Sequence, residues 1–301
     1  MMRVPQIGLL ADGRRLHLQD GPIDLIVEAR GGEADMRAAY DAAARRFTGL
    51  LDELCSELPL LRQAADPGRC PLQGVVARRM HAAVAPFAAD HFITPMAAVA
   101  GAVAEEILGA MTAAAGLERA YVNNGGDIAL HLSGGESFTV GLMDRPDTAG
   151  LLQTMVVDAG DPTRGVATSG RHGRSFSLGI ADAVTVLART ASQADAAATI
   201  IANAVDLPGH PAILRCPANE LQPDSDLGAR LVTRDVGALS GEEIENALAA
   251  GAARARRLLL SGLIEGAALR LCGETVVVEA RLQPPQSQSI HRDMPASLMH
   301  A

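Results

Sequence analysis

The sequence contains no tryptophan, and only 2 % of its 301 residues are aromatic. It has no run of Lys or Arg longer than a pair, and its formal net charge is −9. Proteins that bind nucleic acids use cations to contact phosphates and aromatic side chains to stack on bases. We therefore expect no nucleic-acid partner.

The cysteines and the apolar runs are also sparse. Cys55, Cys70, Cys216 and Cys272 show no Cys-x-x-Cys spacing, which argues against a zinc site or a disulfide framework. No stretch reaches the roughly 18 uninterrupted apolar residues of a membrane span, and the first 21 residues do not resemble a secretion signal. These absences predict reduced thiols, no membrane partner and a cytoplasmic location.

Hydrophobic residues make up 48 % of the chain, enough for a sizeable core. Apolar periodicity, turn residues and a Ser-x-x-Glu capping box predict the main elements. They are a hairpin in 14–29 turning at Asp20-Gly21, helices in 33–58, 94–115 and 240–260, strands in 119–132 and 136–158 with a turn at 144–147, and a hairpin in 264–282.

The densest chemical information lies in residues 165–205. This stretch holds the turn-forming residues Thr168, Ser169 and Gly170, then the apolar run 183–187, then a helix that contains Asp195 and Thr199. A spacing of four places two side chains on the same face of a helix. The carboxylate of Asp195 and the hydroxyl of Thr199 therefore suit a single hard cation.

Two earlier segments are candidates for ligand contacts. Residues 123–127 read Asn-Asn-Gly-Gly-Asp, which offers backbone N–H groups and polar side chains to a phosphate, ribose or ring edge. The same residues equally suit an ordinary hairpin turn. Residues 97–102 are nearly all small, which suits either a ligand cradle or tight helix packing.

These motifs together resemble the ApbE superfamily of FAD:protein FMN transferases. The resemblance rests on four segments in the family's order, with residues 97–104 as an earlier fifth, and it covers most of the chain from Thr94 to Val205. The four segments are Asn123-Asn-Gly-Gly-Asp127-Ile128, Ala167-Thr-Ser-Gly-Arg171, Val184-Thr-Val186 and Ala194-Asp-Ala-Ala-Ala-Thr199.

The resemblance implies an α+β fold with internal duplication, in which antiparallel sheets carry helices on one face. It implies one domain over 1–283, followed by a polar tail, 284–301, that we expect to be disordered. It also implies that Mg²⁺ is held by Asp195, Thr199 and a backbone carbonyl of the small-residue block, on the pyrophosphate of FAD. The implied pocket comprises Met96, Ala100, Gly101, Asn123, Asn124, Gly125, Gly126, Asp127, Thr168, Ser169 and Gly170.

Two departures distinguish this chain from the transferases. They carry Lys-Gly in the small-residue block, where this chain has Ala100-Gly101. They carry a His-Ile-Ile-Asp-Pro segment where residues 175–182 read Ser-Phe-Ser-Leu-Gly-Ile-Ala-Asp. In both departures the chain resembles a separate cytoplasmic branch, the uncharacterised protein family UPF0280.

Three functions stay open at this point. The first is an enzyme that cleaves FAD or transfers FMN to a client protein, with Arg171, His172 and Asp182 as candidate catalytic groups. Alternatively, Arg171 and His172 are solvated loop residues without a catalytic role. The second is a non-catalytic protein that binds a flavin or another small ligand, and the third is an enzyme for a different substrate that uses Asp182 and His91. A homo-oligomer is compatible with each.

Overall fold

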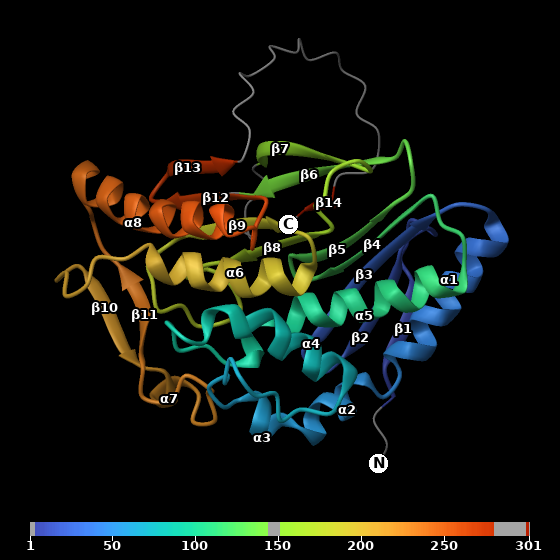
Figure 1. Cartoon of the computed structure of the whole chain (residues 1–301), viewed down its shortest axis with the longest axis horizontal. Helices are drawn as coiled ribbons and strands as arrows, with labels where there is room; N and C mark the ends of the chain where they lie inside the picture. Colours follow the sequence, from blue (N-terminus) through green and yellow to red (C-terminus); the bar gives the residue numbers. More distant parts are fainter. Residues whose placement is uncertain (1–3, 144–150, 280–298, 301) are drawn as a thin grey trace, which may run out of the picture.

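The computed structural model describes residues 4–143, 151–279 and 299–300 of the chain. Its centre is a nine-stranded antiparallel sheet of order β1-β2-β3-β4-β5-β8-β9-β12-β13 (Figure 1). The strands are β1 (Gln6–Leu9), β2 (Leu16–Asp20), β3 (Ile23–Arg30), β4 (Arg119–Asn124), β5 (Asp127–Leu132), β8 (Gly165–Ser169), β9 (Ala183–Ala188), β12 (Gly266–Leu271) and β13 (Glu274–Glu279).

Helices cover one face of this sheet, in front of the strands in Figure 1. Two of them, α5 (Val99–Ala114) and α6 (Ala191–Ala204), lie over the middle of the sheet. The others are α1 (Glu33–Phe47), α2 (Leu50–Ser56), α3 (Leu58–Leu61), α4 (Val75–Val84), α7 (Ala218–Leu221) and α8 (Gly241–Leu260), with short 3₁₀ helices η1 (Ala85–Phe87) and η2 (Pro95–Ala98). The observed architecture confirms the expected α+β class.

A ribbon of β6 (Ser137–Met143) and β7 (Leu151–Asp158) lies on the opposite face of the sheet, and β14 (Met299–His300) pairs with β6. The alternation of side chains along a strand explains two separate cores. Val122 of β4 and Ala129 of β5 join the core under the helices. Tyr121 and Ile128 point to the other side and join a smaller core under the ribbon. We call these the helix face and the ribbon face.

The sheet repeats one arrangement twice. β2, β3, β4 and β5 form an antiparallel set with a helical connection between the second and third strands, and β8, β9, β12 and β13 do the same. β5 and β8 join the two sets through only two residue pairs, Ile128 with Val166 and Ala129 with Gly165. We call this short ladder the seam.

Antiparallel order brings four connections to the same end of the sheet. They are the β2–β3 turn at Gly21, the β4–β5 turn at Gly125 and Gly126, the β8–β9 connection 170–182, and the β12–β13 turn at Cys272. We call this end the site end, because the candidate residues of three motifs lie there.

The long helix expected in 33–58 is wrong, because the chain breaks into α1, α2 and α3. Gly49 adopts φ +84°, in the left-handed region, between α1 and α2. The apolar spacing continues across this break because all three helices cover the same core. The structure also contains β1, α4, β10 (Ile213–Pro217) and β11 (Leu231–Val236), which the sequence pattern did not reveal.

Thr94 occupies the N-cap position of η2 but makes no side-chain capping bond there. Its hydroxyl instead donates to Asp226 at 2.5 Å. Residues 95–114 form a helical segment long and apolar enough to cross a membrane by length and composition. In this fold α5 packs on β4, β5 and α1 and contributes Ile107 and Met111 to the core.

The capping box is confirmed: the Ser240 hydroxyl accepts from the N–H of Glu243, and the Glu243 carboxylate accepts from the N–H of Ser240 at 2.6 Å. The hairpin at Asp20-Gly21 is also confirmed. The turn predicted at 144–147 lies outside the described residues. So does the predicted tail, apart from 299–300.

Candidate functional site

The start of α5 is held between β4 and α6. The buried amide of Asn124, at the end of β4, donates from Nδ2 to the carbonyl oxygen of Ala100 at 3.2 Å. The backbone N–H of Gly101 donates to Oδ2 of Asp195 on α6 at 3.0 Å. No side chain caps α5 at Ala98. The carboxylate of Asp195 therefore satisfies backbone donors that the first turn of a helix leaves open.

Asp127, at the start of β5, lies near Asp195 on the helix face. Its Oδ1 accepts from the N–H of Thr168 at 3.2 Å. Burial raises the pKa of Asp195 to about 7, against the opposing effect of the N–H groups of Gly101 and Ala100. Burial and the nearby charge of Asp195 raise the pKa of Asp127 well above its usual range, although the Thr168 N–H and Arg174 act the other way. Two carboxyl groups in such a site favour a bound cation or proton.

The β4–β5 turn is built from glycines in conformations that other residues rarely adopt. Gly125 has φ +66° and Gly126 has φ +112°, and the N–H of Gly126 donates to Oδ1 of Asn123 at 2.8 Å. A Cβ on Gly125 would lie 1.9 Å from Nη2 of Arg174. The turn therefore needs glycine for its backbone and for the arginine that lies against it.

The structure separates the predicted pocket residues between the two faces of the sheet. Asn124 and Asp127 lie on the helix face with Ala100, Gly101 and Asp195. The side chain of Thr168 points to the ribbon face, where its hydroxyl is 2.8 Å from that of Thr185. The backbone N–H of Thr168, not its hydroxyl, reaches the carboxyl pair.

The remaining predicted pocket residues, Met96, Ser169 and Gly170, have packing and backbone roles. Met96 is half-buried in η2 and packs on the main core. Ser169 ends β8 and pairs with Val184. A Cβ on Gly170 would lie 2.4 Å from the carbonyl oxygen of Asp182, so this glycine permits a close backbone approach.

The three candidate catalytic residues form one cluster at the site end. Oδ1 of Asp182 accepts from Arg171 (Nη2 at 2.6 Å, Nε at 2.9 Å) and lies 3.2 Å from Nε2 of His172. Oδ2 of Asp182 accepts from the backbone N–H of Cys272 at 2.5 Å. Both oxygens are therefore engaged within the protein. The cluster joins the β8–β9 connection to the last hairpin.

His91 lies in a different environment. Burial and the cations Arg254 and Arg257 lower its pKa, while Asp90 raises it. Asp182 contacts Arg171, His172 and Cys272 instead. No contact described in the structure brings His91 and Asp182 together as an acid–base pair.

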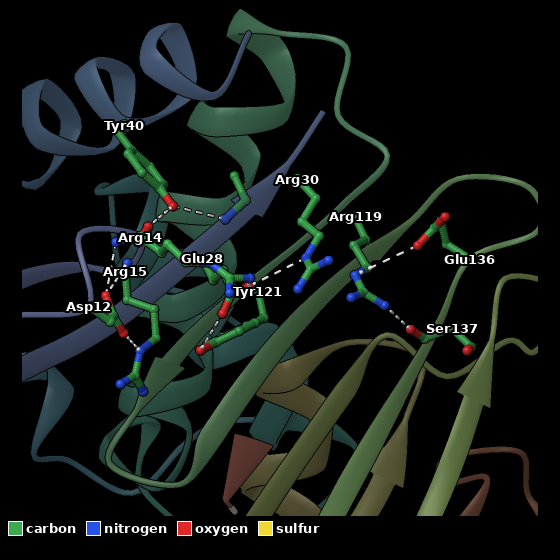
Figure 2. Close-up of polar contacts among 11 residues, drawn as sticks. Asp12, Arg14, Arg15, Glu28, Arg30, Tyr40, Arg119, Tyr121, Glu136 and Ser137 are labelled. Atoms are coloured by element: carbon green, nitrogen blue, oxygen red, sulfur yellow. Dashed lines mark hydrogen bonds and ion pairs between the residues drawn. The ribbon is translucent and has the colours of Figure 1, made fainter. Parts of the chain in front are cut away.

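Four arginines in and beside the first strands of the sheet have carboxylate partners (Figure 2). Arg14 and Arg30 each lie 3.5 Å from Oε1 of Glu28. Arg15 lies 2.5 Å from Asp12 and Arg119 lies 3.6 Å from Glu136. In the same view Tyr40 of α1 donates to the carbonyl oxygen of Arg14 at 2.6 Å and accepts from the N–H of Ala29. This network is structural, since it connects α1 and the first strands.

Sequence reasoning placed Asp195 and Thr199 on one helix face, and α6 has that geometry. It assigned Asp127 to a pocket but not to a carboxyl pair, and it did not identify Arg174. The pairing of Asp127 with Asp195 depends on α6 crossing the seam, which no local pattern encodes. Within the part of the chain that the structure describes, no cluster of three or more His, Cys, Asp or Glu suits a metal.

Comparison with known proteins places this arrangement in a family. A family model described as "AbpE bacteria" matches residues 7–277. A UPF0280 protein of Methanopyrus kandleri is 38 % identical over 183 residues, which cover 60 % of this chain and 69 % of the relative. A UPF0280 protein of Methanothrix thermoacetophila is 33 % identical over 195 residues, with coverages of 64 % and 78 %.

Among solved structures, the flavin transferase ApbE of Vibrio cholerae is 14 % identical with a TM-score of 0.29, and it covers 66 % of this chain and 85 % of that chain. The family assignment itself rests on the sequence matches, which extend over most of the described residues. The chain belongs to the "AbpE bacteria" family and is an ApbE-like UPF0280 protein.

Proposed function

We propose that this protein binds a flavin nucleotide, FAD, together with Mg²⁺ at the site end of the sheet. The observation that carries the proposal is the pair of carboxyl groups from Asp127 and Asp195 beside the start of α5. The motifs that supply this pair are those on which the resemblance to FAD:protein FMN transferases rests.

The donor set fits a hard divalent cation. Each carboxyl uses a named oxygen for a backbone N–H, Oδ1 in Asp127 and Oδ2 in Asp195. Burial raises both pKa values, and the charge of Asp195 raises that of Asp127 further, so a cation would relieve an unfavourable charge state. Asp127, Asp195 and the hydroxyl of Thr199 would hold Mg²⁺, which prefers oxygen ligands and would offset negative charge on a pyrophosphate.

The surrounding residues position the ligand. Asn124 fixes the carbonyl of Ala100, which retains a second lone pair for another contact. The left-handed glycines of the β4–β5 turn allow a ligand to approach the backbone. Half-buried carboxyl groups and small side chains together favour a compact, charged moiety over a large apolar one.

Two activities are compatible with this site. In the first, the protein cleaves FAD at the pyrophosphate or transfers FMN to a hydroxyl of a client protein. In the second, it binds the flavin without turnover. The contacts of Asp182 favour the second, because its carboxylate is held by Arg171 and by the backbone N–H of Cys272 within the protein.

One experiment tests the metal and the activity together. Purified protein and Asp195→Asn are titrated with FAD, with and without Mg²⁺, by calorimetry, and the mixtures are analysed for FMN and AMP. We expect Mg²⁺-dependent binding that Asp195→Asn abolishes and that Asp41→Asn, on the exposed side of α1, retains. Unchanged Mg²⁺ dependence in Asp195→Asn would refute the metal assignment. Formation of FMN and AMP decides between turnover and binding.

A further inference from the structure

At the site end, Arg174 has no carboxylate partner among the residues that the structure describes. Arg174 lies in the β8–β9 connection, exposed, with its guanidinium against Gly125. Its one hydrogen bond given by the structure, from Nη1 to the carbonyl oxygen of Pro22, is long at 3.5 Å. No carboxylate of the described residues lies within ion-pair distance of it. The described residues do not hold the Arg174 guanidinium by a strong contact, so it can contact a ligand.

The neighbouring arginines are used differently. Arg171, three residues earlier, is paired with Asp182 at 2.6 Å and is largely buried. Arg270 of β12 donates to the carbonyl of Gly273 and the hydroxyl of Thr275. The sequence contains no lysine, so every permanent side-chain cation is an arginine.

The electrostatics of the site favour a cation at this place. Asp127 and Asp195 bring two acidic groups to a site where a phosphate-bearing ligand would be repelled. Arg174 is close enough to Asp127 to act on its charge. An arginine presents paired N–H donors that match two phosphate oxygens, and it keeps its charge at every physiological pH.

We propose that Arg174 is a specificity-determining residue that binds a phosphate group of the ligand across the Gly125–Gly126 turn. This inference rests on the proposed function and deepens it, because it selects phosphorylated flavins over the bare ring system. Gly125 leaves the space that the guanidinium occupies, since a Cβ there would lie 1.9 Å from Nη2. The turn and the arginine therefore form one ligand-binding unit.

The test compares wild type, Arg174→Ala and Arg174→Lys in calorimetric titrations with FAD, riboflavin and inorganic pyrophosphate, all with Mg²⁺. We expect Arg174→Ala to raise the Kd for FAD and for pyrophosphate about tenfold. The Kd for riboflavin should stay within about twofold. Arg174→Lys should recover only part of the affinity, because an ammonium group cannot bind two oxygens in the same way.

A matched control is Arg234→Ala, which removes an exposed arginine from β11. It should leave all three titrations unchanged. The inference would be overturned if Arg174→Ala bound FAD and pyrophosphate as tightly as wild type does. It would also be overturned if Arg174→Ala lost as much affinity for riboflavin as for FAD. If wild type binds no flavin, the proposed function fails. A loss of pyrophosphate affinity in Arg174→Ala would then still support the phosphate contact.

Discussion

A Cβ atom on Gly101 would lie 2.3 Å from the carbonyl oxygen of Ala191, so the start of α5 and the start of α6 meet backbone to backbone. This contact sets where Asp195 stands relative to the N–H of Gly101. The small residues of the 97–102 block therefore serve packing, and through packing they position the carboxyl pair. Of the two interpretations that the sequence left open, the structure gives direct evidence for this one.

Gly101→Ala should destabilise the protein by about 1–3 kcal/mol, because the atoms in the way are backbone and cannot rotate aside. In the same helix, a Cβ at Gly109 would have no neighbouring atom within 4 Å. Gly109→Ala should therefore stabilise the protein by up to about 1 kcal/mol. Chemical denaturation of both variants measures the difference. Equal stabilities would show that the two helices can separate without cost.

The carboxyl pair predicts a pH dependence of stability in the absence of ligand. Asp195 titrates near 3.8 in the unfolded chain and near 7 in the folded one. Between these pH values the folded state holds the extra proton, so the free energy of unfolding falls as the pH rises. Asp195 contributes at most about 4 kcal/mol to this fall.

Thermal denaturation between pH 4.5 and 7.5 tests this expectation. Asp195→Asn has no such titration, so its stability should exceed that of wild type by a margin that grows with pH. Added Mg²⁺ should reduce the margin at pH 7.5 by stabilising wild type. A margin that stays constant across the range would contradict the raised pKa.

Asp182→Ala should cost about 3 kcal/mol of stability, because it leaves Arg171 without its partner in a largely buried position. It also removes the acceptor of the Cys272 N–H. Glu33→Ala, which breaks an exposed ion pair with Arg37, should cost no more than about 0.5 kcal/mol. If Asp182→Ala keeps full stability and loses only turnover, Asp182 is catalytic and the structural role is refuted.

Ser240→Ala should cost about 1 kcal/mol through the loss of the capping box of α8. Because α8 packs on β12 and β13, urea denaturation followed by circular dichroism should show the loss in the global transition. A transition identical to that of wild type would mean that water replaces the Ser240 hydroxyl at no cost.

Local chemistry made several elements predictable from the sequence. Asp20-Gly21 encodes a hairpin because glycine accepts φ +57° at the turn, and Ser240 with Glu243 encodes a helix start. Strands were expected in 119–132, and β4 (Arg119–Asn124) and β5 (Asp127–Leu132) lie there. Each signal acts within a few residues of the element that it specifies.

The partners of the site residues were not predictable in this way. Asp182 follows a Gly-Ile-Ala segment and shows no sign in sequence that Cys272, ninety residues later, donates to it. Arg174 is one of three cationic or titratable residues in a short polar stretch. Arg174 differs from Arg171 because the fold places its guanidinium against Gly125. Such contacts arise from topology, which composition and spacing do not specify.

The seam has a mechanical consequence for the molecule. β5 and β8 share two residue pairs, whereas the other ladders of the large sheet contain at least four. The sheet is therefore most compliant along this line. Asp127 belongs to one half of the molecule and Asp195 to the other. A ligand held by both carboxyl groups would brace the two halves, so that binding and stiffening of the sheet are the same event.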